Sequence, residues 1–328
     1  MLNIIKATGQ KLINAVLLIA AVIVLNFLLI HLSPGDPAEV IAGEMGGATE
    51  EMLADIRAEY GLDKPVLVQL GSYLSRVVRG DLGHSFFYNR PVTELILRRL
   101  GPTLLLVITS IVFATIIGTF LGVLAARKPE GIFSSFITIF ALIGYSLPVF
   151  WTAMMLILLF ALRWPIFPVA GMVNILFDGN AFERALNVSY HLVLPAFTLA
   201  IIYLAQYSRL SRASMLEVLR ADYVRTARAK GLRENIVVFK HALRNAVLPI
   251  ITVAGLQFAA VVSGAVLVET VFNWPGLGTL AFDSILRRDY PTLLGILLFS
   301  SVMVVAANLI TDAMYRVVDP RIGLKSAA

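Results

Sequence analysis

The chain has no cysteine among its 328 residues, only four histidines and only 15% charged residues. The absence of cysteine excludes a disulfide scaffold and cysteine-ligated zinc or iron–sulfur sites. The histidines, at positions 31, 84, 191 and 241, share no helical ligand spacing, so no metal site is expected. The chain also lacks a G-x-x-x-x-G-K-[ST] phosphate loop, an H-E-x-x-H motif and a G-x-S-x-G nucleophile elbow. We therefore expect no catalytic residues and no bound cofactor.

Apolar residues dominate what is present. The hydrophobic content is 58% and the mean hydropathy is +0.83, which is too apolar for a soluble globule of this length. The formal charge of +6 is spread over the segments between apolar runs and does not gather on a soluble domain. The composition therefore predicts an integral membrane protein and gives no reason to expect a nucleic-acid partner.

The apolar runs predict an all-α fold with six transmembrane helices, because about 20 apolar residues are needed to cross the hydrocarbon core as a helix. Pro148 lies inside the third run and predicts a kink there. The first run is longer than a signal-peptide core, which favours an uncleaved anchor. The predicted spans are approximately 12–32, 103–126, 133–162, 191–210, 248–272 and 293–318.

The distribution of basic residues predicts that both termini are cytoplasmic. In that orientation the cytoplasmic segments hold 16 Lys and Arg against 5 acids, whereas the outer segments hold 11 against 14 acids. The long basic passage between the fourth and fifth spans then faces the cytoplasm. Trp164, Trp274 and Tyr290 fall near outer span ends and are predicted to be interfacial anchors.

The chain divides into a first part and a core. Residues 1–101 hold the first span and an outer segment with two short amphipathic helices, near 50–60 and 65–78. These helices either cap the bundle, cover the mouth of a pathway or receive a soluble partner. Residues 102–318 form the core, which contains a cytoplasmic segment at 211–247, and a tail follows at 319–328.

The polar passage from Arg209 to Asn245 is much longer than a connection needs to be. Asp222 can begin a short helix, and Gly231 can end it in the left-handed conformation. Small Ala227 and Ala229 sit among basic residues, so this helix can enter a protein groove while its cations meet acids on the rim. The alternative is a basic helix lying on anionic lipid.

This passage resembles the cytoplasmic loop of permease subunits of ABC importers, whose general pattern is Glu-Ala-Ala-x3-Gly followed by Leu-Pro. Here the pattern reads Arg225-Thr226-Ala227-x3-Gly231, with Leu248-Pro249 after a longer gap. Arg and Thr at the first two positions, and the longer gap, are similar to the dipeptide/oligopeptide/nickel branch. Further similar motifs are Pro34-Gly35-Asp36-Pro37, Gly80-Asp81-Leu82-Gly83 with Ser85, Glu269-Thr270-Val271-Phe272 before Trp274-Pro275-Gly276-Leu277-Gly278, Arg288-Asp289-Tyr290-Pro291 and Asp319-Pro320-Arg321.

The resemblance implies a type I ABC importer transmembrane fold and a B-type permease in the bacterial cytoplasmic (inner) membrane. It implies as partners a C-type permease, two cytoplasmic ATPase subunits that bind ATP-Mg, and an extracytoplasmic solute-binding protein, all in a lipid membrane. It also implies a coupling helix that carries ATPase motion to the spans, with residues Asp222, Arg225, Thr226, Ala227, Arg228, Lys230 and Gly231. Peptides are the substrate that the branch favours, with nickel chelates, glutathione and other small solutes as alternatives.

A second class of function is a secondary transporter that works alone. Such proteins use ionisable groups inside the membrane, and Glu269 is the serious candidate in this chain. Small or polar residues inside spans tend to face the bundle, which makes Gly144, Ser146, Gln206 and Asn308 candidates for lining a pathway.

Overall fold

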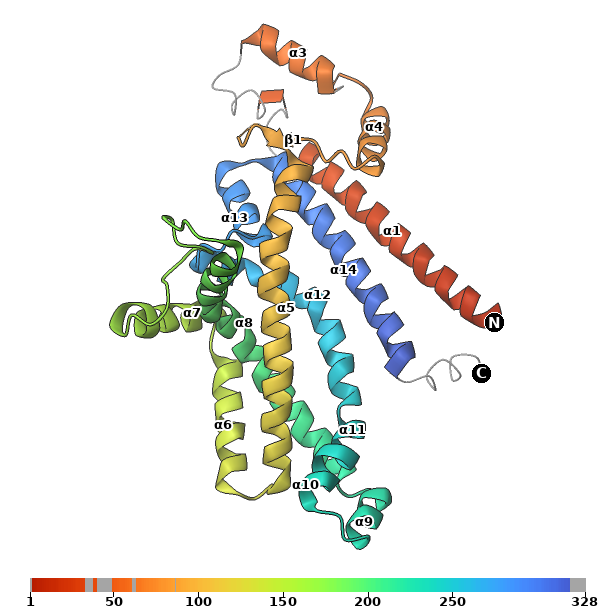
Figure 1. The fold of residues 1–328 in the computed structure, drawn as a ribbon. Helices are drawn as coiled ribbons and strands as arrows, with labels where there is room; N and C mark the ends of the chain where they lie inside the picture. The colour runs from red at the N-terminus through yellow and green to blue at the C-terminus, as the bar shows by residue number, and fades with distance from the viewer. Residues whose placement is uncertain (1, 33–37, 40–48, 61–62, 86, 319–328) are drawn as a thin grey trace. The chain divides into compact units, whose positions relative to one another are not determined.

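The computed structural model describes residues 2–32, 38–39, 49–60, 63–85 and 87–318, and these are helical apart from one two-stranded ladder and the connections (Figure 1). The predicted Pro-Gly-Asp-Pro turn and the tail at 319–328 lie outside the described residues. The long helices are α1 (Leu2–Leu32), α5 (Val92–Arg127), α8 (Ala181–Val218), α12 (Leu248–Val271) and α14 (Tyr290–Val318). The shorter elements are α3 (Glu50–Tyr60), α4 (Val66–Val78), β1 (His84–Ser85), β2 (Arg90–Pro91), α6 (Ile132–Ser146), α7 (Val149–Ile157), the π-helix η1 (Leu158–Arg163), α9 (Asp222–Ala229), α10 (Glu234–Ile236), the π-helix η2 (Val237–Ala242), α11 (Leu243–Ala246) and α13 (Leu277–Arg287).

Several of these helices are long and apolar enough to cross a membrane. Within the described residues, α5, α8 and the Tyr290–Leu309 part of α14 meet this condition alone. Two bent pairs meet it together, one made by Ile132–Ser146 with Val149–Arg163 and one by Glu234–Ala246 with Leu248–Gly255. The described chain therefore has three to five such spans by length and composition, and α1 adds a shorter apolar stretch, Ile13–Leu29.

The third predicted span breaks at Pro148, where a kink was predicted, but far more sharply than a kink. The chain instead forms α6 and then α7 continued by η1, with a bend of 105° between the two parts. The break falls at Leu147 and Pro148, whose ψ values of 133° and 136° are extended. Proline disfavours the helical conformation in the residue before it and has no N–H to continue the ladder, so the turn is sharper than a kink.

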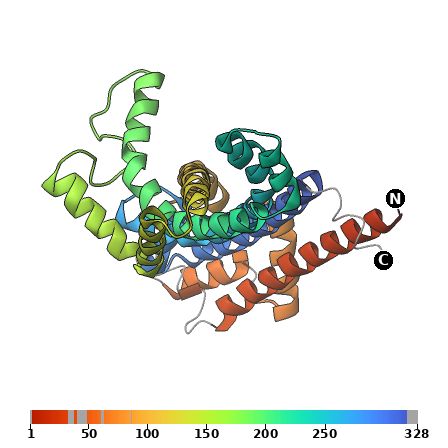
Figure 2. The ribbon, with the colours of Figure 1, turned by 90° about the horizontal axis from the view of Figure 1, so that it is seen from below.

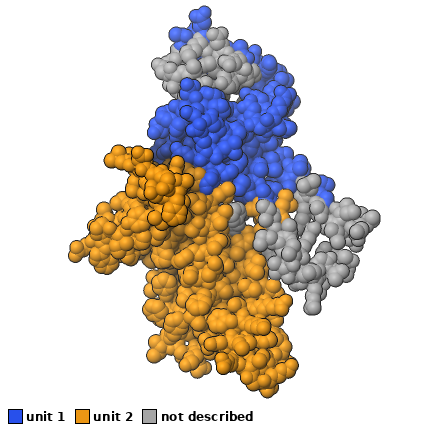
Figure 3. Space-filling view, viewed as in Figure 1, with its two compact units in different colours: residues 1–101, 280–306, 325–328 blue, residues 102–279, 307–324 orange. Residues whose placement is uncertain are grey.

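The chain forms two compact units, drawn in different colours in Figure 3. Among the described residues, unit 1 contains those of 1–101 and 280–306, and unit 2 contains 102–279 and 307–318. In unit 1, the helices predicted near 50–60 and 65–78 are confirmed as α3 and α4. Leu67 of α4 is 81% exposed.

Unit 1 also holds an antiparallel ladder that the sequence did not indicate. His84 pairs with Pro91 and Ser85 with Arg90. The ladder leads directly into α5, where Val92 is fully buried. A Cβ on Gly295 of α14 would lie 2.5 Å from Val92 Cγ1, so the ladder's exit packs closely on that helix.

In unit 2, α5 and α8 approach so closely that only glycine fits at the contact. A Cβ on Gly122 would lie 2.4 Å from the Ser208 carbonyl oxygen, and one on Gly118 would lie 2.8 Å from that of Leu204. Small residues at helix crossings let backbones meet in a membrane, where packing replaces the hydrophobic effect. These two helices are therefore held as a pair.

Trp274 is fully buried in unit 2, so its predicted role as an interfacial anchor was wrong. Its indole N–H donates a hydrogen bond to the Pro102 carbonyl oxygen at 2.9 Å. That carbonyl lies in the first part of α5, where the helix contains a proline. The tryptophan thus finds its polar partner inside the protein and has no need of the membrane surface.

Candidate functional site

The polar excursion, which we define as residues 209–247, folds into a compact set of short helices. Helix α8 runs on to Val218, α9 follows, and after Gly231 the chain forms α10, η2 and α11 before α12 begins. Figures 1 and 2 both place α9 and α10 together, beyond the end of α8. The predicted order of helix, glycine break, helix and then Leu248-Pro249 is confirmed.

Helix α9 turns its small and apolar residues inward. Val224 is fully buried and Ala227 is 6% exposed, and both belong to a hydrophobic cluster within unit 2. The prediction that Ala227 presents a small face to a partner's groove was therefore wrong. Its small side chain instead lets α9 lie against the chain's own helices.

The cluster joins four segments that are far apart in the sequence. Its buried members come from α5, α8, α9 and the η2–α11 segment, and we call it the α9 cluster: Val123, Ala126, Met215, Val224, Ala227, Val237, Val238, Ala242 and Ala246. Close-packed apolar contacts resist independent movement of their members. A displacement of α9 is therefore transmitted directly to α5 and α8.

Polar contacts at the edge of the α9 cluster reinforce this packing. The Arg127 guanidinium, at the end of α5, donates to Asn235 Oδ1 at 2.9 Å. Asn245 Nδ2 donates to the Tyr223 hydroxyl at 2.8 Å, which links α11 to α9. No local sequence pattern indicates these partners, because each bond joins residues from different helices.

Arg228 and Glu234 form the strongest ion pair of the excursion. Arg228 donates from Nη2 to Oε1 at 2.8 Å and from Nε to Oε2 at 3.2 Å. The hydrogen bond from Arg228 lowers the pKa of Glu234, and the same bond raises the pKa of Arg228. The side chains are 42% and 50% exposed, so solvent screens the pair and its contribution to stability is below about 1 kcal/mol.

Gly231 ends α9 in the predicted left-handed conformation, with φ of +74°. Its N–H donates to the Arg228 carbonyl at 2.9 Å, and the Lys230 N–H donates to that of Thr226 at 3.0 Å. A Cβ at Gly231 would meet nothing within 4 Å. Glycine is thus required by the backbone angle alone.

The outer face of α9 and its C-terminus is polar, predominantly basic and exposed. Arg225 makes only a long contact with Asp222, 3.5 Å, so its charge remains available to a partner. Six of the seven predicted coupling residues lie on this face or at its end: Asp222, Arg225, Thr226, Arg228, Lys230 and Gly231. The site thus has a packed inner face and an exposed outer face.

Glu269, the residue on which the rival class of function depends, is fully buried and holds a turn together. Its Oε1 accepts from Thr103 Oγ1 at 2.6 Å, and its Oε2 accepts from the N–H groups of Gly278 and Thr279 at 2.6 and 3.2 Å. Those N–H groups belong to the first turn of α13, where a carboxylate also meets the positive end of the helix dipole. The carboxylate's contacts are those of a structural cap.

The four predicted pathway residues have different surroundings. Gly144 is buried beside α8, where a Cβ added to it would make an ordinary van der Waals contact, 3.6 Å from the Ile201 carbonyl oxygen. Ser146 is exposed but donates to the Leu142 carbonyl of its own helix at 2.8 Å. Gln206 and Asn308 are exposed. Gln206 accepts a hydrogen bond from Gln257, a residue that the sequence analysis did not single out.

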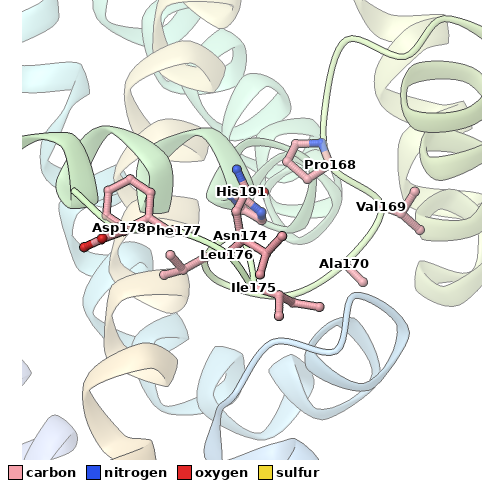
Figure 4. A pocket seen from close by; sticks show the side chains of 10 residues that line it. Pro168, Val169, Ala170, Asn174, Ile175, Leu176, Phe177, Asp178 and His191 are labelled. Carbon is pink, nitrogen blue, oxygen red and sulfur yellow. The ribbon is translucent and has the colours of Figure 1, made fainter.

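A hollow of about 750 Å³ lies beside the connection between η1 and α8 (Figure 4). It is lined by Pro168, Val169, Ala170, Val173, Asn174, Ile175, Leu176, Phe177, Asp178 and His191. His191 Nδ1 lies 2.9 Å from the Asn187 carbonyl of its own helix. Across the described residues, no three His, Asp or Glu side chains gather as metal ligands would.

Apolar spans joined by one structured polar excursion define a multi-pass membrane protein with an exposed, basic helix packed on its spans. Residues 118–324 match the family described as binding-protein-dependent transport system inner membrane component, and residues 4–108 match the N-terminal region of such membrane components. The chain belongs to this family of transport permeases.

Curated relatives align over nearly the whole chain. The dipeptide transport system permease protein DppB of Escherichia coli K12 is 44% identical over 315 residues, covering 91% of this chain and 93% of that protein. The oligopeptide transport system permease protein AppB of Bacillus subtilis is 40% identical over 315 residues, covering 95% and 98%. An inward-facing structure of the MetNI methionine ABC transporter shares the fold, with a TM-score of 0.54 and 18% identity over 69% of this chain and 96% of that chain.

Proposed function

We propose that this chain is a transmembrane permease subunit of an ATP-driven ABC importer and forms half of a translocation pathway for di- or oligopeptides. The energy comes from ATP-Mg hydrolysed on partner subunits. The family match supports the transport role, and the names of the relatives DppB and AppB support peptides as cargo.

One structural observation carries the mechanism, namely the two-sided arrangement of α9. Its outer residues, such as Arg225, are available to an ATPase, whereas its inner residues are packed on α5 and α8 through the α9 cluster. A push on α9 from closing ATPases therefore shifts the two spans with it. This shift switches the pathway between outward and inward access.

The remaining subunits follow from the family and the orientation. We propose a heterodimer with a C-type permease, two cytoplasmic ATPase subunits and an extracytoplasmic solute-binding protein. The chain crosses the bacterial inner membrane six times with both termini in the cytoplasm, an orientation favoured by the basic residues of the excursion. The short helices α3 and α4 then lie outside.

Two alternatives lead to different experiments. Nickel chelates, glutathione or another small solute would leave the assembly unchanged and alter only the cargo. A secondary transporter that uses Glu269 would need that carboxylate to exchange ions, but three hydrogen bonds already hold it at 3.2 Å or less. The importer proposal therefore has the better physical support.

The test is reconstitution of the complete complex, purified through a tag on this chain, in proteoliposomes. Labelled dipeptides and tetrapeptides, a nickel chelate and glutathione are supplied with the binding protein, and uptake is measured with and without internal ATP. ATP-dependent uptake of a peptide supports the proposal. ATP-independent uptake by this chain alone overturns it and directs attention to Glu269.

A further inference from the structure

Two glutamines meet between α8 and α12 within unit 2. Gln257 Nε2 donates a hydrogen bond to Gln206 Oε1 at 2.5 Å. Gln257 Oε1 in turn accepts from the Tyr207 hydroxyl at 3.1 Å. The tyrosine therefore fixes the orientation of the Gln257 amide, which in turn fixes Gln206.

The pair lies within the spans. Gln257 is nine residues into α12 from Leu248, or about 14 Å along the helix, and Gln206 lies on α8 three residues before Arg209, where the excursion begins. The hydrocarbon core is about 30 Å thick, so Gln257 lies within it, and the hydrogen bond holds the Gln206 amide at the same level.

The hydrogen bonds of the pair leave one group available. A glutamine amide has two N–H donors, and in the described part of the chain the Gln206 amide nitrogen has no acceptor. Gln206 is also exposed. An exposed amide donor facing lipid tails costs several kcal/mol, so this face meets water or another polar group.

The exposed residues that follow Gln206 are mostly polar as well. They continue from it into the excursion at spacings of three and four residues, on α8 and just after its end: Gln206, Arg209, Ala213, Glu217 and Arg220. We call this the α8 stripe. The exposed face of α5 has the same spacing but is wholly apolar: Leu105, Ile108, Val112, Ile116 and Phe120. Gln206 thus stands at the membrane end of a face that the excursion exposes to water, whereas the α5 face is apolar, as a lipid-facing one is.

We propose that Gln206 and Gln257 form a peptide-contacting amide pair at the head of a water-filled route that follows the α8 stripe. The free Gln206 N–H donates to a backbone carbonyl of the passing substrate, as the N–H of a neighbouring β-strand would. The site contacts the peptide group and ignores the side chains, which suits a carrier of varied peptides. This inference rests on the proposed function for the identity of the cargo, but the water-filled route does not depend on it.

The route is tested with single cysteines, because the chain has none of its own. Gln206→Cys and Ile116→Cys are made in the complete complex in vesicles, and the labelling of this chain by a charged, water-soluble thiol reagent is followed. We expect Gln206→Cys to label at least ten times faster than Ile116→Cys and to be protected by a transported dipeptide. Equal slow labelling at both positions, with or without ATP, would overturn the route whatever the cargo.

The amide contact is tested by uptake. Gln206→Leu keeps the size of the side chain but removes the N–H donor, and Gln257→Leu removes the amide that orients Gln206. Each variant is expected to lower the maximal rate of peptide uptake about five- to tenfold with KM unchanged. Thr138→Val is the control, because its hydroxyl donates only to Ser134 of its own helix. If the wild type transports peptide and both leucine variants transport it at the same rate, the amide contact is wrong but the proposed cargo stands. No peptide uptake by the wild type would sink the proposed cargo and this contact together.

Discussion

The Ser85 hydroxyl donates a hydrogen bond to Asp289 Oδ2 at 2.6 Å, across 204 residues of sequence, and both side chains are fully buried. Asp289 Oδ1 accepts a hydrogen bond from the Thr292 backbone N–H at 3.2 Å. Ser85 Oγ accepts one from the Tyr88 backbone N–H at 3.1 Å. This pair ties the β1–β2 ladder to the start of α14 within unit 1. It also joins two of the sequence motifs that carried the family resemblance.

Removal of the Ser85 hydroxyl should weaken unit 1. In Ser85→Ala the buried Asp289 carboxylate loses its shortest hydrogen bond, which we expect to lower the free energy of unfolding by about 1–3 kcal/mol. Thermal unfolding of the detergent-solubilised protein measures the change. Ser189→Ala is the matched control, because the Ser189 hydroxyl is exposed and donates only to Ala185 of its own helix. Equal melting temperatures for the two variants would contradict the role of the pair.

Gly276 should be the least replaceable glycine near Glu269. A Cβ there would lie 2.2 Å from the Glu269 carboxyl carbon, so Gly276→Ala must displace the carboxylate from its three hydrogen bonds. We expect a loss of several kcal/mol and poor recovery of folded protein. In contrast, Gly71→Ala lies inside α4 with open space around the new methyl group and should stabilise that helix by about 0.5–1 kcal/mol.

Each glycine variant is compared with the wild type by the amount of folded protein that size-exclusion chromatography recovers after heating. A Gly276→Ala protein as stable as the wild type would show that Glu269 is free to move, and it would revive the carrier hypothesis.

The two alanines of α9 should respond differently to a charge. Ala227→Asp puts a carboxylate into the α9 cluster, so we expect destabilisation of about 2–4 kcal/mol and loss of transport together. Ala229→Asp places the same charge on an exposed position, so stability should stay within about 0.5 kcal/mol of the wild type. Any loss of transport in Ala229→Asp then reports the contact with the ATPase. The measurements are melting temperature and ATP-dependent uptake for each variant. An Ala227→Asp protein of normal stability would contradict the inward orientation of that residue.

The ion pair of the excursion should matter only above acidic pH. Arg228 lowers the pKa of Glu234 below its ordinary value of 4.5, so the stabilisation is fully present above 4.5 and is lost as pH falls through the folded-state pKa. The pKa of Arg228 is raised, so its own contribution would be lost only at strongly alkaline pH, outside the usable range. Glu234→Gln should lower stability by less than about 1 kcal/mol at pH 7, and by progressively less as the pH falls below 4.5.

Melting temperatures across this range check the Glu234 prediction, with Glu217→Gln as a surface control. A deficit in Glu234→Gln that persists undiminished at the acidic end would rule out the ion pair as its cause.

Local patterns in the sequence predicted the helices well and their packing poorly. Apolar runs located the long helices, and Gly231 was a reliable stop because its requirement is local. The 105° bend at Pro148 exceeded expectation, because a proline fixes where a helix breaks, whereas the tertiary packing sets the angle. Trp274 was misplaced for a related reason, since its partner at Pro102 is 172 residues away.

The same limit applies to the candidate site. Composition identified the basic outer face of α9, but only packing could show that Ala227 turns inward. Gln257 was missed although one signal was available, since it is an amide inside an otherwise apolar run, as Gln206 is. The contact of Ser85 with Asp289 had no local signal at all.

The central claim is that α9 presents its outer face to an ATPase while its inner face packs on the spans. The most direct measurement is cross-linking from single cysteines at Ala229 and at Val224 in the assembled complex, with a short thiol-to-amine reagent. The account predicts that Ala229→Cys joins this chain to an ATPase subunit and that Val224→Cys, which is buried in the α9 cluster, does not. A cross-link from Val224→Cys alone, or from neither position in a complex that hydrolyses ATP, would contradict it.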